Sequence, residues 1–166
     1  MKTPAPIIAV IGGGPAGLMA AEAATAHGAQ VHVFDSMASC GRKFLLAGKG
    51  GLNLTHQDTG ETLLNRYGAA RDALAPAISD FDSNAMRQWA SGLDVACFVG
   101  SSGRVFPDDM KAAPLLRRWL RRLRNDGVQF YLRHTWSGWV DDRTLAFVTP
   151  AGALSFECDA IVLACG

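Results

Sequence analysis

Three glycines near the N-terminus have the spacing of a phosphate-binding turn. Gly12, Gly14 and Gly17 follow a run of apolar residues at 7–11. In such a turn the first glycine permits the bend, the second lets the backbone approach a pyrophosphate, and the third lets a helix pack against the strand. The N–H groups that begin the helix then meet negative charge with a favourable dipole. The spacing therefore predicts a dinucleotide-binding site.

An acidic residue, Asp35, stands at the end of a second apolar run, at 31–34. In dinucleotide-binding folds an acid roughly 20 residues beyond the glycines hydrogen-bonds the ribose hydroxyls of adenosine. The same carboxylate would repel a 2′-phosphate, so we predict that a nucleotide bound here is not NADP. A turn aspartate without a ligand is the alternative interpretation, and the glycines upstream favour the ribose role.

These residues need a strand, a helix and a second strand to bring them together. Residues 7–11 and 31–34 are rich in β-branched and other apolar side chains, as buried parallel strands are. The alanine-rich segment at 20–26 has high helix propensity, and Gly28 is placed to end that helix. The first 35 residues thus predict a βαβ unit.

A long glycine-rich segment follows at 36–60, and it carries the cations Arg42, Lys43 and Lys49. We predict an irregular loop here, and such loops in compact domains are usually functional or disordered. Apolar side chains interleaved at 44–46, 52 and 54 make disorder a poor interpretation, because they favour burial in a core.

Helices and a strand are expected in the middle of the chain. Residues 61–82 predict only a short helix near Leu63 and Tyr67, and 83–90 predict a second helix capped by Asp82 or Ser83. A short strand at 93–99 and a turn at 100–103 come next. Residues 108–125 predict a longer helix with one apolar stripe, in which Pro114 is tolerable only in the first turn, and 128–132 predict a strand.

Three strand-like runs at 136–140, 145–149 and 154–158 are separated by turn residues and predict a small antiparallel meander. A last apolar run at 160–164 predicts a buried strand before Cys165 and Gly166. The predicted fold class is α/β: a Rossmann-like parallel sheet with helices on one face and the antiparallel meander on the other.

Composition limits the function classes. The four cysteines of the chain are scattered without the spacing of a zinc site, so we predict no metal site. The chain has 166 residues and a formal net charge of +1. Near-neutral charge argues against nucleic-acid and membrane partners, and the arginine-rich run at 117–124 is interpreted as the solvated face of a helix. No signal peptide or membrane span is recognised, which favours a cytoplasmic location. Cys40 is interpreted as a buried or idle thiol, and a place close to the bound nucleotide, beside Gly41, is the less favoured alternative.

Longer motifs carry a family resemblance. The segments GRKFLLAGKGGLNLTH and SSGRVFPDDMKA resemble signature segments of the BaiN-like, or aminoacetone-oxidase-family, FAD-binding flavoproteins, and the final DAIVLACG is similar to the strand that returns to FAD in that fold. The resemblance touches the whole chain and implies a cofactor, FAD, in a flavin-dependent oxidoreductase with a small-molecule substrate. NAD(P)H as electron donor to the longer protein is a further implied option.

The resemblance also implies roles for individual residues. The glycine turn would hold the pyrophosphate, Asp35 the adenosine ribose, and residues 48–53 would run along the flavin side. Trp136 would stand where backbone groups meet adenine. The implied cofactor-binding set is Gly12, Gly14, Pro15, Ala16, Gly17, Asp35, Ser36, Gly41, Arg42, Lys43, Gly48, Gly50, Gly51, Asn53, Trp136, Cys165 and Gly166. Many relatives carry Gly-Gly-Arg-Cys-Asn where this chain has residues 50–53, so a role of that Arg or Cys does not transfer.

Two other function classes stay open at this point. One is a non-enzymatic nucleotide-binding module, either a nucleotide sensor or a nucleic-acid binder using the arginine run, and the other is half of an NAD-dependent dehydrogenase. The Gly41-Arg42 pair favours FAD over NAD. No catalytic side chain is recognisable. We expect residues 1–166 to be one FAD-binding domain, the N-terminal fragment of a longer flavoprotein without its substrate domain, with weak FAD affinity and no turnover of its own.

Overall fold

The structure is a computed structural model that describes residues 4–47 and 50–166. It divides into two compact units. Unit 1 takes the chain up to Phe44 together with Leu120–Gly166, and unit 2 takes Leu45–Trp119. The two units are described separately below.

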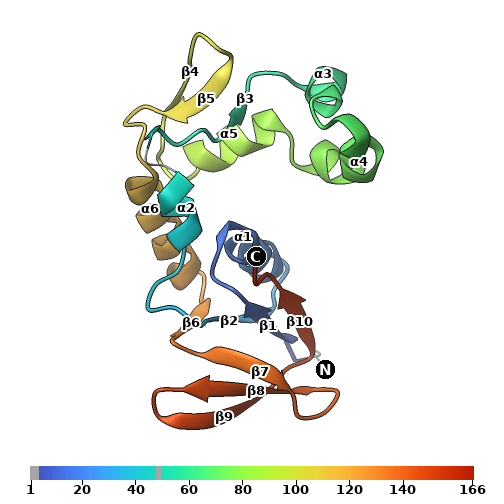
Figure 1. Cartoon of the computed structure of the whole chain (residues 1–166), viewed down its shortest axis with the longest axis vertical. Helices are drawn as coiled ribbons and strands as arrows, with labels where there is room; N and C mark the ends of the chain where they lie inside the picture. The colour runs from blue at the N-terminus through green and yellow to red at the C-terminus, as the bar shows by residue number, and fades with distance from the viewer. Residues whose placement is uncertain (1–3, 48–49) are drawn as a thin grey trace. The chain divides into compact units, whose positions relative to one another are not determined.

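A four-stranded parallel sheet is the centre of unit 1 (Figure 1). Its strands are β1 (Ile7–Ile11), β2 (Gln30–Asp35), β6 (Gln129–Leu132) and β10 (Ala160–Leu163), in the order β10-β1-β2-β6. Every neighbouring pair is parallel. The sequence-based βαβ unit is therefore confirmed, with β2 beginning one residue before the predicted run. The two later strands are confirmed as strands, each one residue shorter than predicted, but the expectation that the last strand is buried was wrong, because β10 lies at the edge of the sheet and none of its residues is buried.

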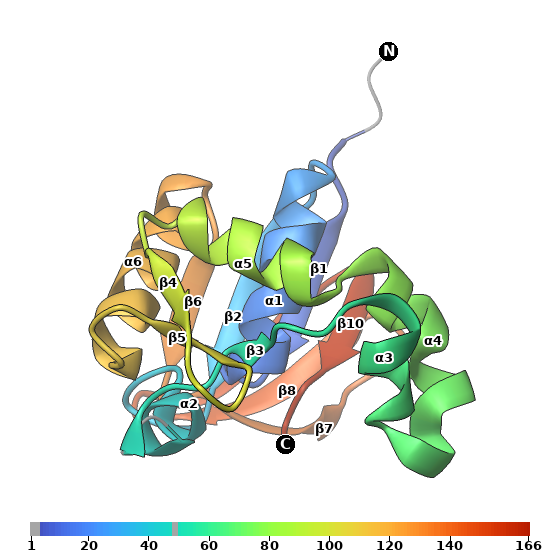
Figure 2. The same ribbon diagram turned by 90° about the horizontal axis from the view of Figure 1, so that it is seen from above.

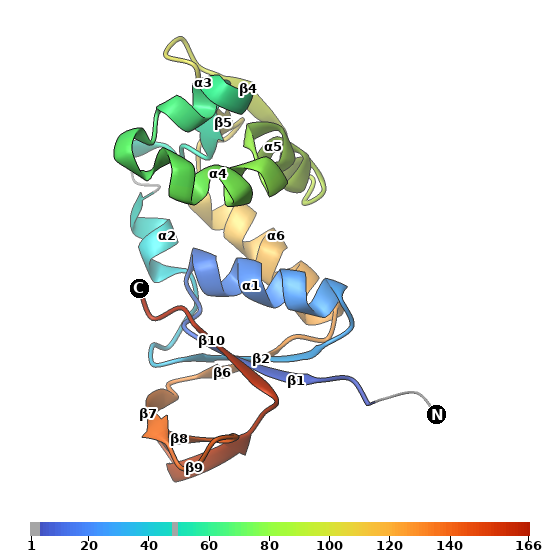
Figure 3. The same cartoon turned by 90° about the vertical axis from the view of Figure 1, so that its right-hand side faces the viewer.

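Helix α1 (Pro15–Ala26) covers one face of this sheet (Figure 3). Its buried residues Leu18 and Ala21 lie on the side of α1 that packs on the strands. The last turns of α6 (Ala112–Asn125) belong to the same unit, and Arg122 forms an ion pair with Glu22 of α1 at 2.6 Å. Gly28 ends α1 with φ +83°, a conformation that favours glycine.

The antiparallel meander covers the opposite face of the sheet (Figure 3). It consists of β7 (Thr135–Trp139), β8 (Thr144–Thr149) and β9 (Gly152–Glu157), in that order. Phe34 of β2 stacks on Phe147 of β8 with ring centroids 4.2 Å apart, and both rings are fully buried. The predicted α/β fold, with helices on one face and a meander on the other, is confirmed.

Unit 2 contains a small antiparallel sheet and several helices. The strands β3 (Thr55–His56), β5 (Arg104–Pro107) and β4 (Cys97–Val99) are adjacent in that order, and Figure 2 shows them with α5 (Ser83–Ser91). Asp82 caps α5 by accepting a hydrogen bond from Ala85 N at 2.8 Å, as predicted. The remaining elements are α3 (Gly60–Asn65), the 3₁₀ turn η2 (Gly68–Ala70), α4 (Arg71–Asp80) and the first turns of α6.

Several local predictions were wrong. The segment expected to be an irregular loop includes α2 (Arg42–Ala47) and β3, and the predicted strand at 93–99 is ordered as a strand only from Cys97. Helix α4 was missed because Pro76 lies inside it and none of its residues is buried, so it has neither good propensity nor a buried stripe. Helix α6 begins at Ala112 rather than 108, which does leave Pro114 in the first turn.

Burial of His32 makes the stability of unit 1 depend on pH. His32 is 8% exposed on β2, and its Nδ1 lies 3.2 Å from the Tyr131 hydroxyl. Burial lowers the pKa of His32 below its usual 6.5. The unfolded chain therefore takes up a proton near pH 6.5 that the folded chain does not. Stability is full above that pH and falls as the pH drops toward the folded pKa.

We predict that His32→Phe, which keeps a ring beside Tyr131 and Phe156, removes part of this acid sensitivity. The free energy of unfolding, measured by urea denaturation at pH 7.5 and pH 5.5, should differ less between the two pH values in the variant than in the wild type. His27→Gln, at an exposed histidine that follows α1, is the matched control. An equal loss of stability in wild type and H32F would contradict the prediction.

Candidate dinucleotide site

Two of the three motif glycines are required by the fold itself. Gly12 has φ +111°, its N–H donates to Phe34 O at 2.8 Å, and a Cβ at this position would overlap the carbonyl oxygen of Ala164. A Cβ on Gly17 would overlap the carbonyl oxygen of Gly12. Both substitutions would push backbone against backbone, so these glycines bring β1, β10 and α1 into close contact.

Gly14 is different because nothing in the described structure requires a glycine at this position. A Cβ at this position would meet no atom within 4 Å, and its backbone is ordinary extended chain with φ −77°. Gly14 is the N-cap of α1, yet no side chain caps the helix and no acid lies in its first turn. The N–H groups of Ala16 and Gly17 have no acceptor within the helix. The positive end of α1 therefore faces an open cradle that suits an anion.

Asp35 is held directly beside this cradle. Its Oδ2 accepts a hydrogen bond from Gly13 N, and its Oδ1 accepts one from Met37 N, each at 2.8 Å. The carboxylate is thus oriented by backbone on both oxygens, and each oxygen keeps a further lone pair for a ligand hydroxyl. Exposed Ser36 follows it in the chain.

The segment at 40–43 also returns to the glycine turn. Gly41 has φ +72°, and its N–H donates to Gly13 O at 2.8 Å. Lys43 extends to the end of β10, where a Cβ placed on Gly166 would lie 2.6 Å from the Lys43 Nζ. Arg42 is exposed at the start of α2. The ammonium group of Lys43 therefore adds positive charge at the edge of the sheet where the parallel strands end, the edge at which α/β folds bind ligands.

Cys165 lies at the same edge. Its thiol is exposed and contacts Ile11 O at a long 3.9 Å, while Gly166 takes φ +78°. The structure thus brings together predicted residues from three distant stretches, which are 12–17, 35–43 and 165–166.

The interpretation of Cys40 as a buried thiol is confirmed, and the structure also places this thiol against the glycine turn. Its thiol is buried against the glycine turn, since a Cβ on Gly13 would lie 2.5 Å from the sulfur and 2.8 Å from Asp35 Oδ2. Burial, followed by the negative charge of Asp35, raises the pKa of Cys40 to about 11 against a smaller lowering by Arg124. The thiol is therefore protonated at neutral pH. The position of Cys40 beside Gly41 was the sequence signal for a place near the nucleotide.

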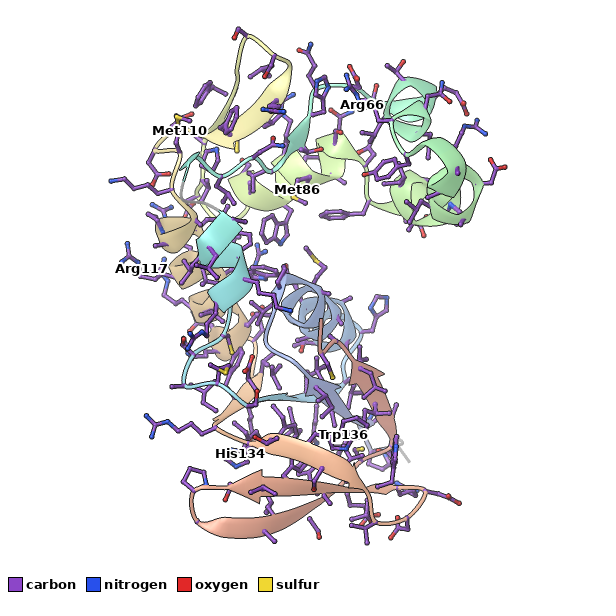
Figure 4. All side chains as sticks on the ribbon, in the orientation of Figure 1. Arg66, Met86, Met110, Arg117, His134 and Trp136 are labelled. Carbon is purple, nitrogen blue, oxygen red and sulfur yellow. The ribbon has the colours of Figure 1, made fainter. Side chains whose placement is uncertain are left out.

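Trp136 was predicted to stand where backbone groups meet adenine, and the structure shows where its side chain lies. Its side chain is partly buried against the core between the parallel sheet and the meander (Figure 4), and its indole Nε1 has no hydrogen-bond partner among the described residues. The residues just before Trp136 hydrogen-bond to the end of β2 and the segment after it. Arg133 N donates to Met37 O at 3.0 Å, and His134 N donates to Asp35 O at 2.9 Å. Arg133 and His134 are the site neighbours that the sequence did not indicate.

The remaining predicted residues belong to unit 2 or lie outside the described residues. Gly48 is in the second class, and Gly50, Gly51 and Asn53 are in unit 2. Gly51 has φ +113°, and a Cβ there would lie 2.7 Å from the Met110 Cε. Asn53 is exposed. Their role along a flavin stays a prediction.

Across residues 4–47 and 50–166, no group of three or more His, Cys, Asp or Glu side chains could hold a metal ion. Over the same ranges no helix is both long and apolar enough to cross a membrane.

Comparison with known proteins identifies relatives of this chain. The 3-dehydro-bile acid delta(4,6)-reductase of Clostridium scindens is 29% identical over 173 residues, which is 96% of this chain and 38% of the relative. The chain therefore spans well under half the length of that protein.

Solved structures share the fold at low sequence identity. THI4 of Thermovibrio ammonificans matches with a TM-score of 0.65 at 17% identity, covering 97% of this chain and 57% of that one. The 3-ketosteroid-delta4-(5alpha)-dehydrogenase of Rhodococcus jostii RHA1 matches with a TM-score of 0.66 at 14% identity, covering 98% and 46%.

The family described as the HI0933-like protein Rossmann domain matches residues 6–166. This match spans the glycine turn, Asp35 and the last strand, and it confirms the resemblance that the motifs indicated. The chain belongs to the HI0933-like Rossmann domain family.

Proposed function

We propose that this chain is the FAD-binding part of a flavin-dependent oxidoreductase that acts on a small-molecule substrate. The observation that carries the proposal is the open cradle at Gly14, where an uncapped helix end stands beside a carboxylate oriented by Gly13 N and Met37 N. Membership of the family and the reductase named among its relatives support the redox part.

The residues present fit the ADP half of such a cofactor. The backbone N–H groups of Gly14, Ala16 and Gly17 would hold the pyrophosphate, and Lys43 would add a positive charge beside it. The free lone pairs of Asp35 would accept hydrogen bonds from the ribose hydroxyls. The flavin, when bound, would supply hydride or electron transfer, while this chain binds and orients it.

The adenine end would meet backbone from the start of the meander. The hydrogen bonds from Arg133 and His134 hold that backbone beside Asp35 and Met37. Trp136 would contribute through its main chain, because its indole packs toward the core. The cofactor set of 17 residues predicted from the sequence stays our proposal, with Arg133 and His134 added.

A nucleic-acid partner is the weaker alternative, because several arginines of α6 are engaged within the chain. Arg122 pairs with Glu22, Arg118 donates to Leu93 O at 3.1 Å, and the Arg124 guanidinium lies 5.1 Å from the Phe130 ring centroid. An NAD-dependent dehydrogenase half would share the ADP site, and only binding can separate it from a flavoprotein. NAD(P)H as electron donor is a further proposal of the same kind.

The direct test is a titration of the purified chain with FAD, FMN, NAD and NADP, followed by quenching of flavin and tryptophan fluorescence. FAD should bind at least tenfold more tightly than NAD, and FMN, which lacks the AMP part of FAD, should bind weakly. Tight NAD binding without FAD binding would refute the flavoprotein assignment.

Alanine substitutions should separate the ligand role of Gly14 from the fold role of Gly17. Gly14→Ala places its methyl group in the open cradle, so we expect unchanged thermal stability and a rise in the FAD dissociation constant of about tenfold or more, about 1.4 kcal/mol. Gly17→Ala forces its methyl group against Gly12 O, so we expect a lower melting temperature even without FAD. Equal FAD affinity in wild type and G14A would count against the cradle.

Removal of the Lys43 charge should weaken FAD binding in a salt-dependent way. We expect Lys43→Met to raise the dissociation constant about three- to tenfold at low ionic strength, and less at 0.5 M NaCl, because salt screens the lost attraction. Lys111→Met changes the net charge equally at an exposed residue of unit 2 and is the matched control. If both variants lose the same affinity, Lys43 has no specific role.

A further inference from the structure

A second binding feature lies in unit 2, in a depression of about 430 Å³ between α5 and the start of β4. Figure 2 shows α5 and β4, which contact each other. One wall is the outer face of α5, with Asn84, Arg87, Gln88 and Ser91, and the other is residues 95–97. We call this depression the Arg87 groove. Its volume falls within the range of small-molecule sites, roughly 300–1,000 Å³.

The α5 wall is polar because its opposite face packs inward. Ala90 is fully buried, and Trp89 packs edge-on against Trp119 with ring centroids 4.8 Å apart. Helical spacing then places the four polar residues of the groove on one outward stripe. Two amides, a hydroxyl and a guanidinium are thereby directed to one depression, while Val95 and Cys97 supply a half-buried apolar wall.

Arg87 supplies a positive charge in the groove that forms no ion pair within the described residues. No ion pair or hydrogen bond joins its guanidinium to another residue in 4–47 or 50–166. Its field reaches Cys97, where it lowers the pKa of the thiol against larger raising effects of burial and Asp108. The groove thus combines positive charge, hydrogen-bonding amides and an apolar wall.

Another depression makes the contrast clear. It measures about 520 Å³ at the end of the meander and includes Arg143. There the guanidinium is already paired with Asp159 and lies 3.8 Å from Glu157. A ligand anion would compete with these paired carboxylates, whereas no carboxylate of the described residues is paired with Arg87.

We propose that the Arg87 groove binds a small organic carboxylate. The planar guanidinium would take the carboxylate in a two-point hydrogen-bonded pair, and the Asn84 and Gln88 amides would bind further polar atoms of the ligand. The short carbon chain of the bound carboxylate would lie on Val95 and Cys97. This site shares neither residues nor chemistry with the dinucleotide cradle. A test of carboxylate binding here is therefore independent of the proposed function.

The Cys97 thiol provides the reporter for a test on the full chain. Succinate is the probe, and peptide-resolved mass spectrometry follows alkylation of Cys97 by iodoacetamide at pH 8.5. We expect saturable protection of at least threefold, because a bound carboxylate covers the thiol and offsets the Arg87 charge that favours the thiolate. Sodium chloride at equal ionic strength and the neutral analogue succinamide should give no saturable protection.

Arginine variants decide whether the protection is specific. Arg87→Gln should abolish it, and Arg117→Gln, an equal charge change at an exposed residue of α6, should retain it. Unchanged circular dichroism of R87Q rules out unfolding as the cause, and NMR shifts of the Asn84 and Gln88 side-chain amides give a second readout in the wild type. No saturable protection, equal protection in R87Q, or protection by inorganic phosphate but not succinate would overturn the proposal.

Discussion

The hydrogen bond from Gly13 N to the Asp35 carboxylate is the contact on which the arrangement of unit 1 depends. It joins the turn after β1 to the end of β2, and it fixes an acid beside the uncapped start of α1. The bond is charge-assisted and partly buried, which makes it stronger than a neutral bond. Gly41 and Cys40 then pack on the same turn, so one backbone junction determines the position of the helix end, the acid and the following segment.

This junction explains why glycine is needed for different reasons at neighbouring positions. Gly12 and Gly17 allow backbone atoms to approach, Gly13 leaves room for Cys40 and Asp35, and Gly14 leaves room that no described protein atom fills. In the proposed function, the ligand would occupy the space that is left open at Gly14. The same spacing pattern therefore contains two glycines that the fold requires, Gly12 and Gly17, and one, Gly14, that we propose serves a ligand, and only the geometry separates them.

The predictable part of the molecule is the part whose signals are local and periodic. The βαβ unit, the Asp82 cap and the meander follow from buried runs, turn residues and capping chemistry. The α2 and α4 helices escaped because each lacks a buried residue, and Pro76 argued against α4. In the site, the glycines and Asp35 were recognisable by spacing. Cys40 was indicated only as an alternative, by its place beside Gly41. Arg133 and His134 were not recognisable, because their contacts depend on tertiary packing of the segment after β6.

The two proposed sites use different physics, and this has a consequence for how they tolerate substitution. The cradle in unit 1 offers backbone N–H groups and a helix dipole, which side-chain changes can block but not delete. The Arg87 groove in unit 2 offers side-chain charge and amides, which one substitution can remove without disturbing the Ala90 and Trp89 packing behind it. A site made of backbone groups therefore lasts as long as its fold, whereas a site made of side chains can be gained or lost on an unchanged helix. The ligand chemistry of the proposed groove in unit 2 can then vary while the proposed dinucleotide site of unit 1 persists.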